Sequence, residues 1–135
     1  MIYTRIMAVE FNHCDPAGIV FYPRYFEMAN SLVENFFADV MGHSFGDMMA
    51  ASQGVPTARL DANVKAPSRL GDKLEWALRV VRVGGSSIFF IATATVGDQL
   101  RLSADITLVW VTAGKPARWP DAMRARFEAF QGEAT

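Results

Sequence analysis

The chain has 135 residues, of which 51% are hydrophobic and 20% are charged, a composition that predicts one folded domain with a substantial core. Its formal net charge of −1 gives no global attraction for nucleic acid, and no stretch is long and apolar enough to cross a bilayer. One cysteine and two histidines argue against a disulfide framework and against a Cys/His zinc site, so we expect a cytoplasmic protein without a metal.

The N-terminal part predicts a strand, a turn and a long helix. Residues 1–11 indicate a strand, and the Asp-Pro-Ala-Gly stretch at 15–18 is typical of a turn. From Pro23 to Met41 apolar residues recur at spacings of three and four, which predicts a helix with one broad apolar face. The expected stripe comprises Phe26, Ala29, Leu32, Val33, Phe36, Phe37, Val40 and Met41. Pro23 suits the first helical position, and Gly42 is a suitable end.

The remainder of the chain changes to a period of two. Four strands are predicted at 59–66, 72–83, 88–96 and 100–111, and a short amphipathic helix at 120–130. In the first of these strands Leu60, Ala62 and Val64 are expected to form a half-buried face. Short connections favour an antiparallel sheet, against which the long helix buries its stripe, so residues 1–135 predict a single α+β domain. Some strands are apolar on both faces, and the helix can cover only one of them. A second subunit is therefore expected to cover the other face.

A serine-hydrolase motif occurs at residues 42–46, Gly-His-Ser-Phe-Gly, but it lacks the expected context. The motif requires a preceding strand and a following helix, whereas here it follows a helix. We therefore interpret it as a helix-ending loop. The alternative, a serine hydrolase, predicts that Ser44→Ala abolishes activity.

Asp15 has two interpretations from the residues alone. Asp-Pro begins turns, and its carboxylate can accept a nearby backbone N–H. The same carboxylate also precedes a predicted helix N-terminus, where free N–H groups favour developing negative charge. A nucleophile or base beside such N–H groups is an arrangement for acyl transfer.

The stretch EFNHCDPAGIVFYPRYF at residues 10–26, followed by a long helix and an antiparallel sheet, resembles the hotdog-fold acyl-CoA thioesterases. It is most similar to the 4-hydroxybenzoyl-CoA thioesterase family. The resemblance implies a single hotdog domain, with a long central helix wrapped by a five-stranded antiparallel sheet. It also implies that Asp15 is the catalytic nucleophile or general base, that the backbone N–H of Tyr22 polarises the thioester carbonyl, and that Gly18 belongs to the same turn.

The same resemblance implies an acyl-CoA substrate with an aromatic acyl group, bound where two subunits of a homodimer or tetramer meet. Asn30 takes the place of an acidic residue that meets the phenol in the hydroxybenzoyl enzyme, and Phe21, Tyr25 and Met28 are expected as pocket walls. Candidate residues for the phosphates of coenzyme A are Arg82, Lys115 and Arg118, although the family's basic cluster at the strand turn is missing. Coenzyme A is part of the substrate, and no other cofactor is implied.

His13 lies two residues before Asp15 and is expected either to assist proton transfer or to face solvent. Two alternatives stay open. A short-chain acyl-CoA or acyl-carrier-protein thioesterase also carries an aspartate in this turn, often with a nearby histidine. A non-catalytic acyl-CoA-binding module would keep the same fold.

Overall fold

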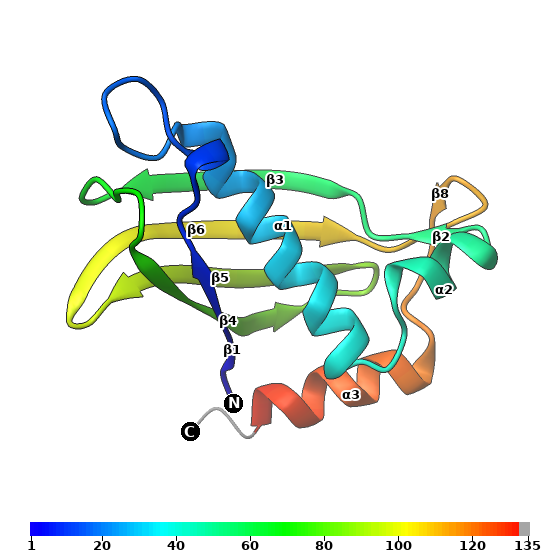
Figure 1. The fold of residues 1–135 in the computed structure, drawn as a ribbon. Helices are drawn as coiled ribbons and strands as arrows, with labels where there is room; N and C mark the ends of the chain where they lie inside the picture. The colour runs from blue at the N-terminus through cyan, green and yellow to red at the C-terminus, as the bar shows by residue number, and fades with distance from the viewer. Residues whose placement is uncertain (133–135) are drawn as a thin grey trace.

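A computed structural model describes residues 1–132, and it places one α-helix across one face of an antiparallel sheet (Figure 1). The sheet contains β1 (Tyr3–Ala8), β4 (Lys73–Val83), β5 (Ser87–Val96), β6 (Gln99–Val109) and β3 (Thr57–Val64), in the order β1-β4-β5-β6-β3. Every neighbouring pair in this order is antiparallel. The α+β class and the five-stranded antiparallel sheet predicted from the sequence are therefore confirmed.

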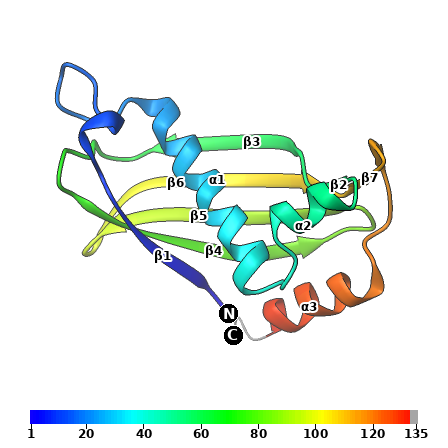
Figure 2. The same ribbon diagram turned by 45° about the vertical axis from the view of Figure 1, so that its right-hand side comes forward.

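The helices and the small sheet complete the chain. They are the 3-10 helix η1 (Phe11–His13), α1 (Tyr22–Asp39), α2 (Phe45–Ala50), α3 (Asp121–Gly132), and the short strands β2 (Gln53–Gly54), β7 (Val111–Thr112) and β8 (Lys115–Pro116). Figure 2 shows from a second side that α1 crosses the sheet, while α3 runs along the edge near the chain termini. No helix within residues 1–132 is long and apolar enough to span a membrane.

The buried face of α1 differs slightly from the expected stripe. Tyr25 and Met28 are buried, whereas Phe26 is 37% exposed. The helix also ends at Asp39, two residues before the predicted Met41. Spacings of three and four on a wide apolar surface fit either choice of neighbouring positions, so the periodicity alone did not separate Tyr25 from Phe26.

The core lies between α1, α3 and the concave side of the sheet. Four alternate residues of β4 face this core and are all buried, namely Leu74, Trp76, Leu78 and Val80. Phe36 of α1 packs edge-to-face on Phe90 of β5 and stacks with Phe127 of α3. Burying such a phenylalanine stabilises the fold by about 2–3 kcal/mol, so these contacts fix α1 on the sheet.

The prediction for β3 was wrong in its burial. Leu60 is 39% exposed and Val64 is 53% exposed, and only Ala62 on this strand is partly buried. The physical reason is position, because β3 is the edge strand next to β6 and its other edge pairs with no strand of the described chain. Alternation of apolar and polar residues shows that a strand has two different faces, but it does not show whether the strand lies at the edge of the sheet.

Candidate functional site

A small hairpin carries Asp15 immediately before α1. The N–H of Phe21 donates to the carbonyl of His13 at 2.9 Å, and the N–H of Asp15 donates to the carbonyl of Ile19 at 3.0 Å. The N–H of Gly18 closes the turn on the carbonyl of Asp15 at 2.9 Å. Figure 1 shows this loop projecting beyond the sheet at the end where α1 begins.

The Asp15 carboxylate makes one local hydrogen bond. Its Oδ1 accepts the N–H of Ala17 at 2.9 Å, as expected for a turn-forming aspartate. Its Oδ2 has no hydrogen-bond partner among residues 1–132. One oxygen is thus oriented by the turn, while the other is available to a substrate or a water. Gly18 has φ of +81°, a backbone conformation that glycine adopts without the cost of a side chain.

The N-terminus of α1 supplies free donors beside this turn. Phe21 is the N-cap and Tyr22 the first helical residue, so the N–H of Tyr22 has no partner inside the helix. Pro23 takes the second helical position rather than the expected first. The Tyr22 side chain is 62% exposed, which leaves the helix start open. Such an N–H, together with the helix dipole, can stabilise an oxyanion.

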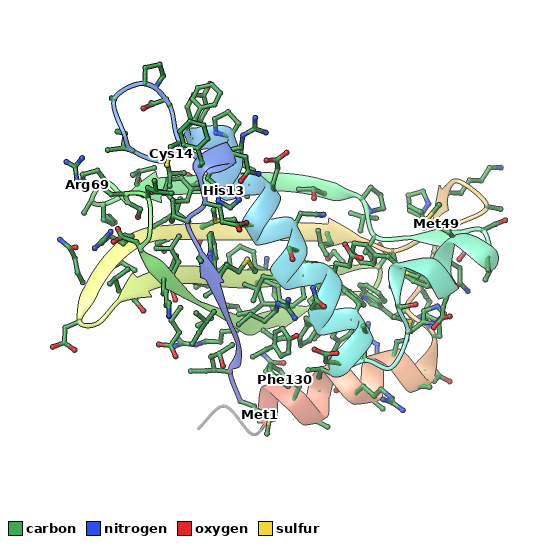
Figure 3. The ribbon with its side chains drawn as sticks, in the orientation of Figure 1. Met1, His13, Cys14, Met49, Arg69 and Phe130 are labelled. Atoms are coloured by element: carbon green, nitrogen blue, oxygen red, sulfur yellow. The ribbon has the colours of Figure 1, made fainter. Side chains whose placement is uncertain are left out.

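His13 has a defined orientation in the loop. Its Nδ1 accepts the N–H of Glu10 at 2.8 Å, so the neutral ring carries its proton on Nε2. Cys14 is half-buried and packs against the core. Figure 3 shows His13 and Cys14 close to the start of α1, with Arg69 at the same end of the molecule.

A second loop holds the hairpin in place, and sequence reasoning missed it. The N–H of Val20 donates to the carbonyl of Ser68 at 2.8 Å. Arg101 of β6 then holds that loop, because its Nη1 donates to the carbonyl of Pro67 at 3.1 Å, to Ser68 Oγ at 3.2 Å and to Asp72 Oδ2 at 2.8 Å. These partners lie 29 to 34 residues away in the chain, so no local pattern in the sequence signals them.

Asp72 is the acidic partner in this arrangement. Its Oδ2 accepts the backbone N–H of Arg69 at 2.9 Å as well as the Arg101 guanidinium. The hydrogen bond from the Arg69 backbone, followed by that from Arg101, holds the pKa of the Asp72 carboxyl below its ordinary value. The carboxylate therefore stays ionised and keeps the loop closed at neutral pH.

A cavity of about 370 Å³ opens between α1, α2 and the halves of β3 and β6 that lie away from the Asp15 hairpin. Its walls include Phe26, Ala29, Asn30, Val33, Phe45, Met48, Met49, Gln53, Gly54, Val55, Pro56, Thr57, Leu60, Ile106 and Leu108. Tyr22, Phe26 and Asn30 follow one another at intervals of four residues, so they lie along one face of α1. The rings of Tyr22 and Phe26 meet edge-to-face at 6.3 Å. That helix face leads from the free N–H of Tyr22 into the cavity.

The expected pocket walls need correction in part. Asn30 does line the cavity, but Phe21, Tyr25 and Met28 do not. Tyr25 is 2% exposed and belongs to the core. Because the buried face of α1 includes Tyr25, its neighbour Phe26 faces the cavity. Methionines do contribute to the cavity, as Met48 and Met49 of α2, a helix that the sequence interpretation did not include.

The basic candidates lie at the other end of the sheet from Asp15. Arg82 is near the end of β4, with its guanidinium carbon 5.7 Å from the centre of the Phe89 ring. Arg118 adjoins the β4–β5 turn, because the next residue, Trp119, donates its N–H to the carbonyl of Gly85 at 3.0 Å. Lys115 is in β8, which Figures 1 and 2 also show far from the 13–21 loop. All three side chains are exposed.

Residues 42–44 of the Gly-His-Ser-Phe-Gly motif form a loop after the end of α1, as predicted, whereas Phe45 and Gly46 begin α2. Gly42 has φ of +65°, just after α1 ends. The Oγ of Ser44 accepts the N–H of Asp47 at 3.0 Å and caps α2. This hydroxyl therefore has a structural role. Within residues 1–132, no three His, Cys, Asp or Glu side chains gather as a metal-binding group.

Comparison with known proteins places this architecture among thioesterases. Residues 9–127 match the family model described as the Thioesterase-like superfamily. A comparison with curated proteins gives no significant match. The fold and the family match define a thioester hydrolase. The chain belongs to the Thioesterase-like superfamily.

Solved structures share the fold at low sequence identity. A thioesterase from Thermus thermophilus, complexed with coenzyme A and Zn, is 26% identical with a TM-score of 0.82, covering 96% of this chain and 93% of its own. A 1,4-dihydroxy-2-naphthoyl-CoA thioesterase from Synechocystis is 17% identical with a TM-score of 0.85, covering 94% and 96%. The BH1999 gentisyl-coenzyme A thioesterase is 21% identical with a TM-score of 0.86, covering 92% and 98%. These likenesses support the α+β fold of the superfamily.

Proposed function

We propose that the protein hydrolyses an acyl-CoA thioester, with an aromatic acyl group preferred, to the free acid and coenzyme A. The observation that carries this proposal is the helix face of Tyr22, Phe26 and Asn30, which links a free backbone N–H to a largely apolar cavity. Two of the structurally similar proteins act on aromatic acyl-CoA thioesters, and a third is complexed with coenzyme A. The proposal places the chain with the 4-hydroxybenzoyl-CoA thioesterases inside the superfamily.

The proposed chemistry uses the chain's own groups. The thioester oxygen accepts a hydrogen bond from the N–H of Tyr22, which stabilises the negative charge that develops on it. Asp15 Oδ2 either attacks the carbonyl carbon, forming an anhydride that water then hydrolyses, or takes a proton from the attacking water. The carbon–sulfur bond breaks and the thiolate of coenzyme A departs. A thiol has a pKa of about 8.5, so it leaves with little acid assistance.

Gly18 and His13 have supporting roles in this proposal. Gly18 allows the turn that orients Asp15, through its positive φ and its hydrogen bond to the Asp15 carbonyl. His13 presents its Nε2–H as a donor, because the N–H of Glu10 occupies its Nδ1. Either the carboxylate product or the departing sulfur is a suitable acceptor.

The proposal includes a dimer, because the proposed catalytic residue and the proposed phosphate-binding residues lie far apart within one chain. Asp15 lies at one end of the sheet, and Arg82, Lys115 and Arg118 lie at the other. Pairing the free edge of β3 antiparallel with the same strand of a second copy sets opposite ends of the two sheets side by side. The basic residues of one copy then approach Asp15 of the other, where they can bind the phosphates of coenzyme A. A tetramer would join two such dimers.

The decisive experiment measures thiol release from benzoyl-, 4-hydroxybenzoyl-, phenylacetyl- and butyryl-CoA by wild type and Asp15→Asn. The asparagine can still accept the N–H of Ala17, so the turn persists while the nucleophile or base is lost. We expect a loss of about a hundredfold or more in kcat. Asp98→Asn, which changes an exposed carboxylate in the β5–β6 turn, is the matched control and should leave the rate unchanged. A fully active Asp15→Asn protein would rule out the mechanism.

The short-chain alternative receives support from two observations. His13 stands beside the Asp15 turn, and the aliphatic and methionine side chains Val33, Met48, Met49 and Leu108 also suit an alkyl chain. The same substrate panel separates the two, since faster release from butyryl-CoA than from the aromatic thioesters would favour this alternative. Saturable binding of every thioester without thiol release would instead indicate a binding module.

A further inference from the structure

Gln53 occupies a distinctive position at the far end of the cavity. It is in β2, which follows α2 and pairs with β7, at the end of the sheet opposite the 13–21 loop. Gln53 lines the large cavity and also a second hollow next to it, whose walls include His43, Trp110 and Arg126. Its half-buried carboxamide is therefore the polar group between the two spaces.

His43 fixes the orientation of the Gln53 carboxamide. The His43 Nε2 lies 2.7 Å from Gln53 Oε1, and since that oxygen is an acceptor, the imidazole donates its N–H. His43 is itself held by two contacts. Its backbone N–H donates to the carbonyl of Phe37 at 3.0 Å, and its ring lies 6.3 Å from that of Trp110. The side-chain amide is thus oriented before any ligand binds.

The contact with His43 uses the oxygen of the Gln53 carboxamide and leaves its two N–H donors unused. The oxygen and nitrogen of a carboxamide are separate atoms in one plane, so the oxygen accepts from His43 while the Gln53 Nε2 keeps both of its N–H donors. No side-chain hydrogen bond from this nitrogen occurs in the part of the chain that is described. A half-buried amide without a partner is a group that a ligand oxygen can satisfy. Around it, the cavity walls are mostly apolar.

The length of the cavity sets the kind of acyl group that can reach Gln53. The cavity follows α1 from Phe26 to Val33, which is about 10 Å of helix at 1.5 Å per residue. Tyr22 lies one turn before Phe26, and Gln53 of β2 lines the cavity at the end of the sheet opposite the 13–21 loop. An acyl group whose carbonyl is at the Tyr22 N–H must therefore extend beyond a single ring to meet Gln53.

We propose that Gln53 is a specificity-determining residue that donates a hydrogen bond to a hydroxyl or oxo oxygen at the distal end of an elongated acyl group. His43 is the residue that positions it. This assignment rests on the proposed thioesterase function and deepens it, because it names the part of the acyl group that the enzyme recognises. A site that donates a hydrogen bond to a substrate oxygen favours that substrate over an analogue that lacks the oxygen.

The test compares matched thioesters that differ only in the distal oxygen. We would measure kcat/KM for 4′-hydroxybiphenyl-4-carbonyl-CoA and biphenyl-4-carbonyl-CoA with wild type, Gln53→Met and the control Met49→Leu. Met49 also lines the cavity but is 79% exposed and carries no donor. Wild type and Met49→Leu should prefer the hydroxylated substrate, and Gln53→Met should lose that preference by about tenfold or more. If Gln53→Met instead lowers kcat/KM by the same factor for both substrates, the assignment is wrong.

A double-mutant cycle tests the role of His43. If His43 acts through the Gln53 carboxamide, His43→Leu should reduce the preference for the hydroxylated substrate, and adding it to Gln53→Met should cause no further reduction. Additive losses of preference would contradict a positioning role, because a purely structural effect of His43 does not depend on Gln53.

Binding of the free acids separates this inference from the proposed function. If no thioester is hydrolysed, the proposed function fails, but calorimetry with 4′-hydroxybiphenyl-4-carboxylic acid and biphenyl-4-carboxylic acid still reports on Gln53. Tighter binding of the hydroxylated acid by wild type, lost in Gln53→Met, would support the assignment without any activity. Equal affinities, or no binding of either acid, would overturn it.

Discussion

At the scale of single residues, Gly18 is the backbone position on which the Asp15 turn depends. Its φ of +81° is costly for any residue with a side chain, although a Cβ there would meet no atom within 4 Å. Gly18→Ala should therefore lower the free energy of unfolding by about 1–2 kcal/mol through backbone strain alone. If the turn relaxes instead, kcat should fall while the melting temperature holds.

Gly85→Ala is the matched control for this prediction. Gly85 is also in an exposed turn where an added Cβ would meet no atom within 4 Å, but its φ is not positive. Thermal unfolding and thiol release should both be unchanged in this variant. A Gly18→Ala protein with wild-type stability and activity would show that the turn does not need glycine.

The residues of the turn also show what the sequence could predict. It offered a turn-forming Asp15 and a chemical Asp15 as alternatives, whereas the structure shows that one carboxylate oxygen makes the turn and the other is unpaired within residues 1–132. The two interpretations are therefore compatible. Gln53 was not predicted, because its significance comes from His43 and from a cavity wall built by separate elements.

At the scale of elements, the ion pair between Arg101 and Asp72 joins β6 to the loop that holds the Asp15 hairpin. Its side chains are only 12% and 28% exposed. Arg101→Met should remove four hydrogen bonds, three of them to the loop at residues 67–72, and lower the free energy of unfolding by about 2–3 kcal/mol, measured by urea denaturation. The loosened hairpin should also reduce kcat. Arg79→Met, on the exposed side of β4, is the control and should change neither quantity.

The same ion pair predicts how the stability of the protein depends on pH in the acidic range. Because the folded protein holds the pKa of Asp72 below its ordinary value, the stabilisation is fully present above the unfolded-state pKa of about 4. It is lost as the pH falls through the lower, folded-state value. Wild type should therefore lose stability over this range more steeply than Asp72→Asn, measured by thermal unfolding as a function of pH. Equal slopes for the two proteins would contradict the coupling.

Elements also differed in how well the sequence predicted them. The strands β4, β5 and β6 and the helix α3 were predicted to within a few residues, because their apolar residues follow one clear period. The two-residue strands β2, β7 and β8 are too short to show any period. The burial of β3 was mispredicted because it depends on a neighbour, and the described chain itself provides one on only one side.

At the scale of the whole molecule, the separation of Asp15 from the basic residues leads to a test by mixing variants. Asp15→Asn lacks the proposed catalytic carboxylate, and a triple variant with Arg82, Lys115 and Arg118 changed to alanine lacks the proposed phosphate contacts. Each alone should show a low kcat/KM. In a mixed dimer, one of the two sites receives Asp15 from one chain and the basic residues from the other, so that site is intact.

Random exchange of subunits at equal concentrations makes half of the dimers mixed, with one intact site in each. The mixture should therefore recover about a quarter of wild-type kcat/KM. Light scattering would establish the assembly, and two separately purified variants mixed just before the assay, without time for exchange, serve as the control. Recovery would place the two halves of the site on different chains. An established dimer that exchanges subunits without any recovery would place the whole site on one chain, and the arrangement through β3 would then be wrong.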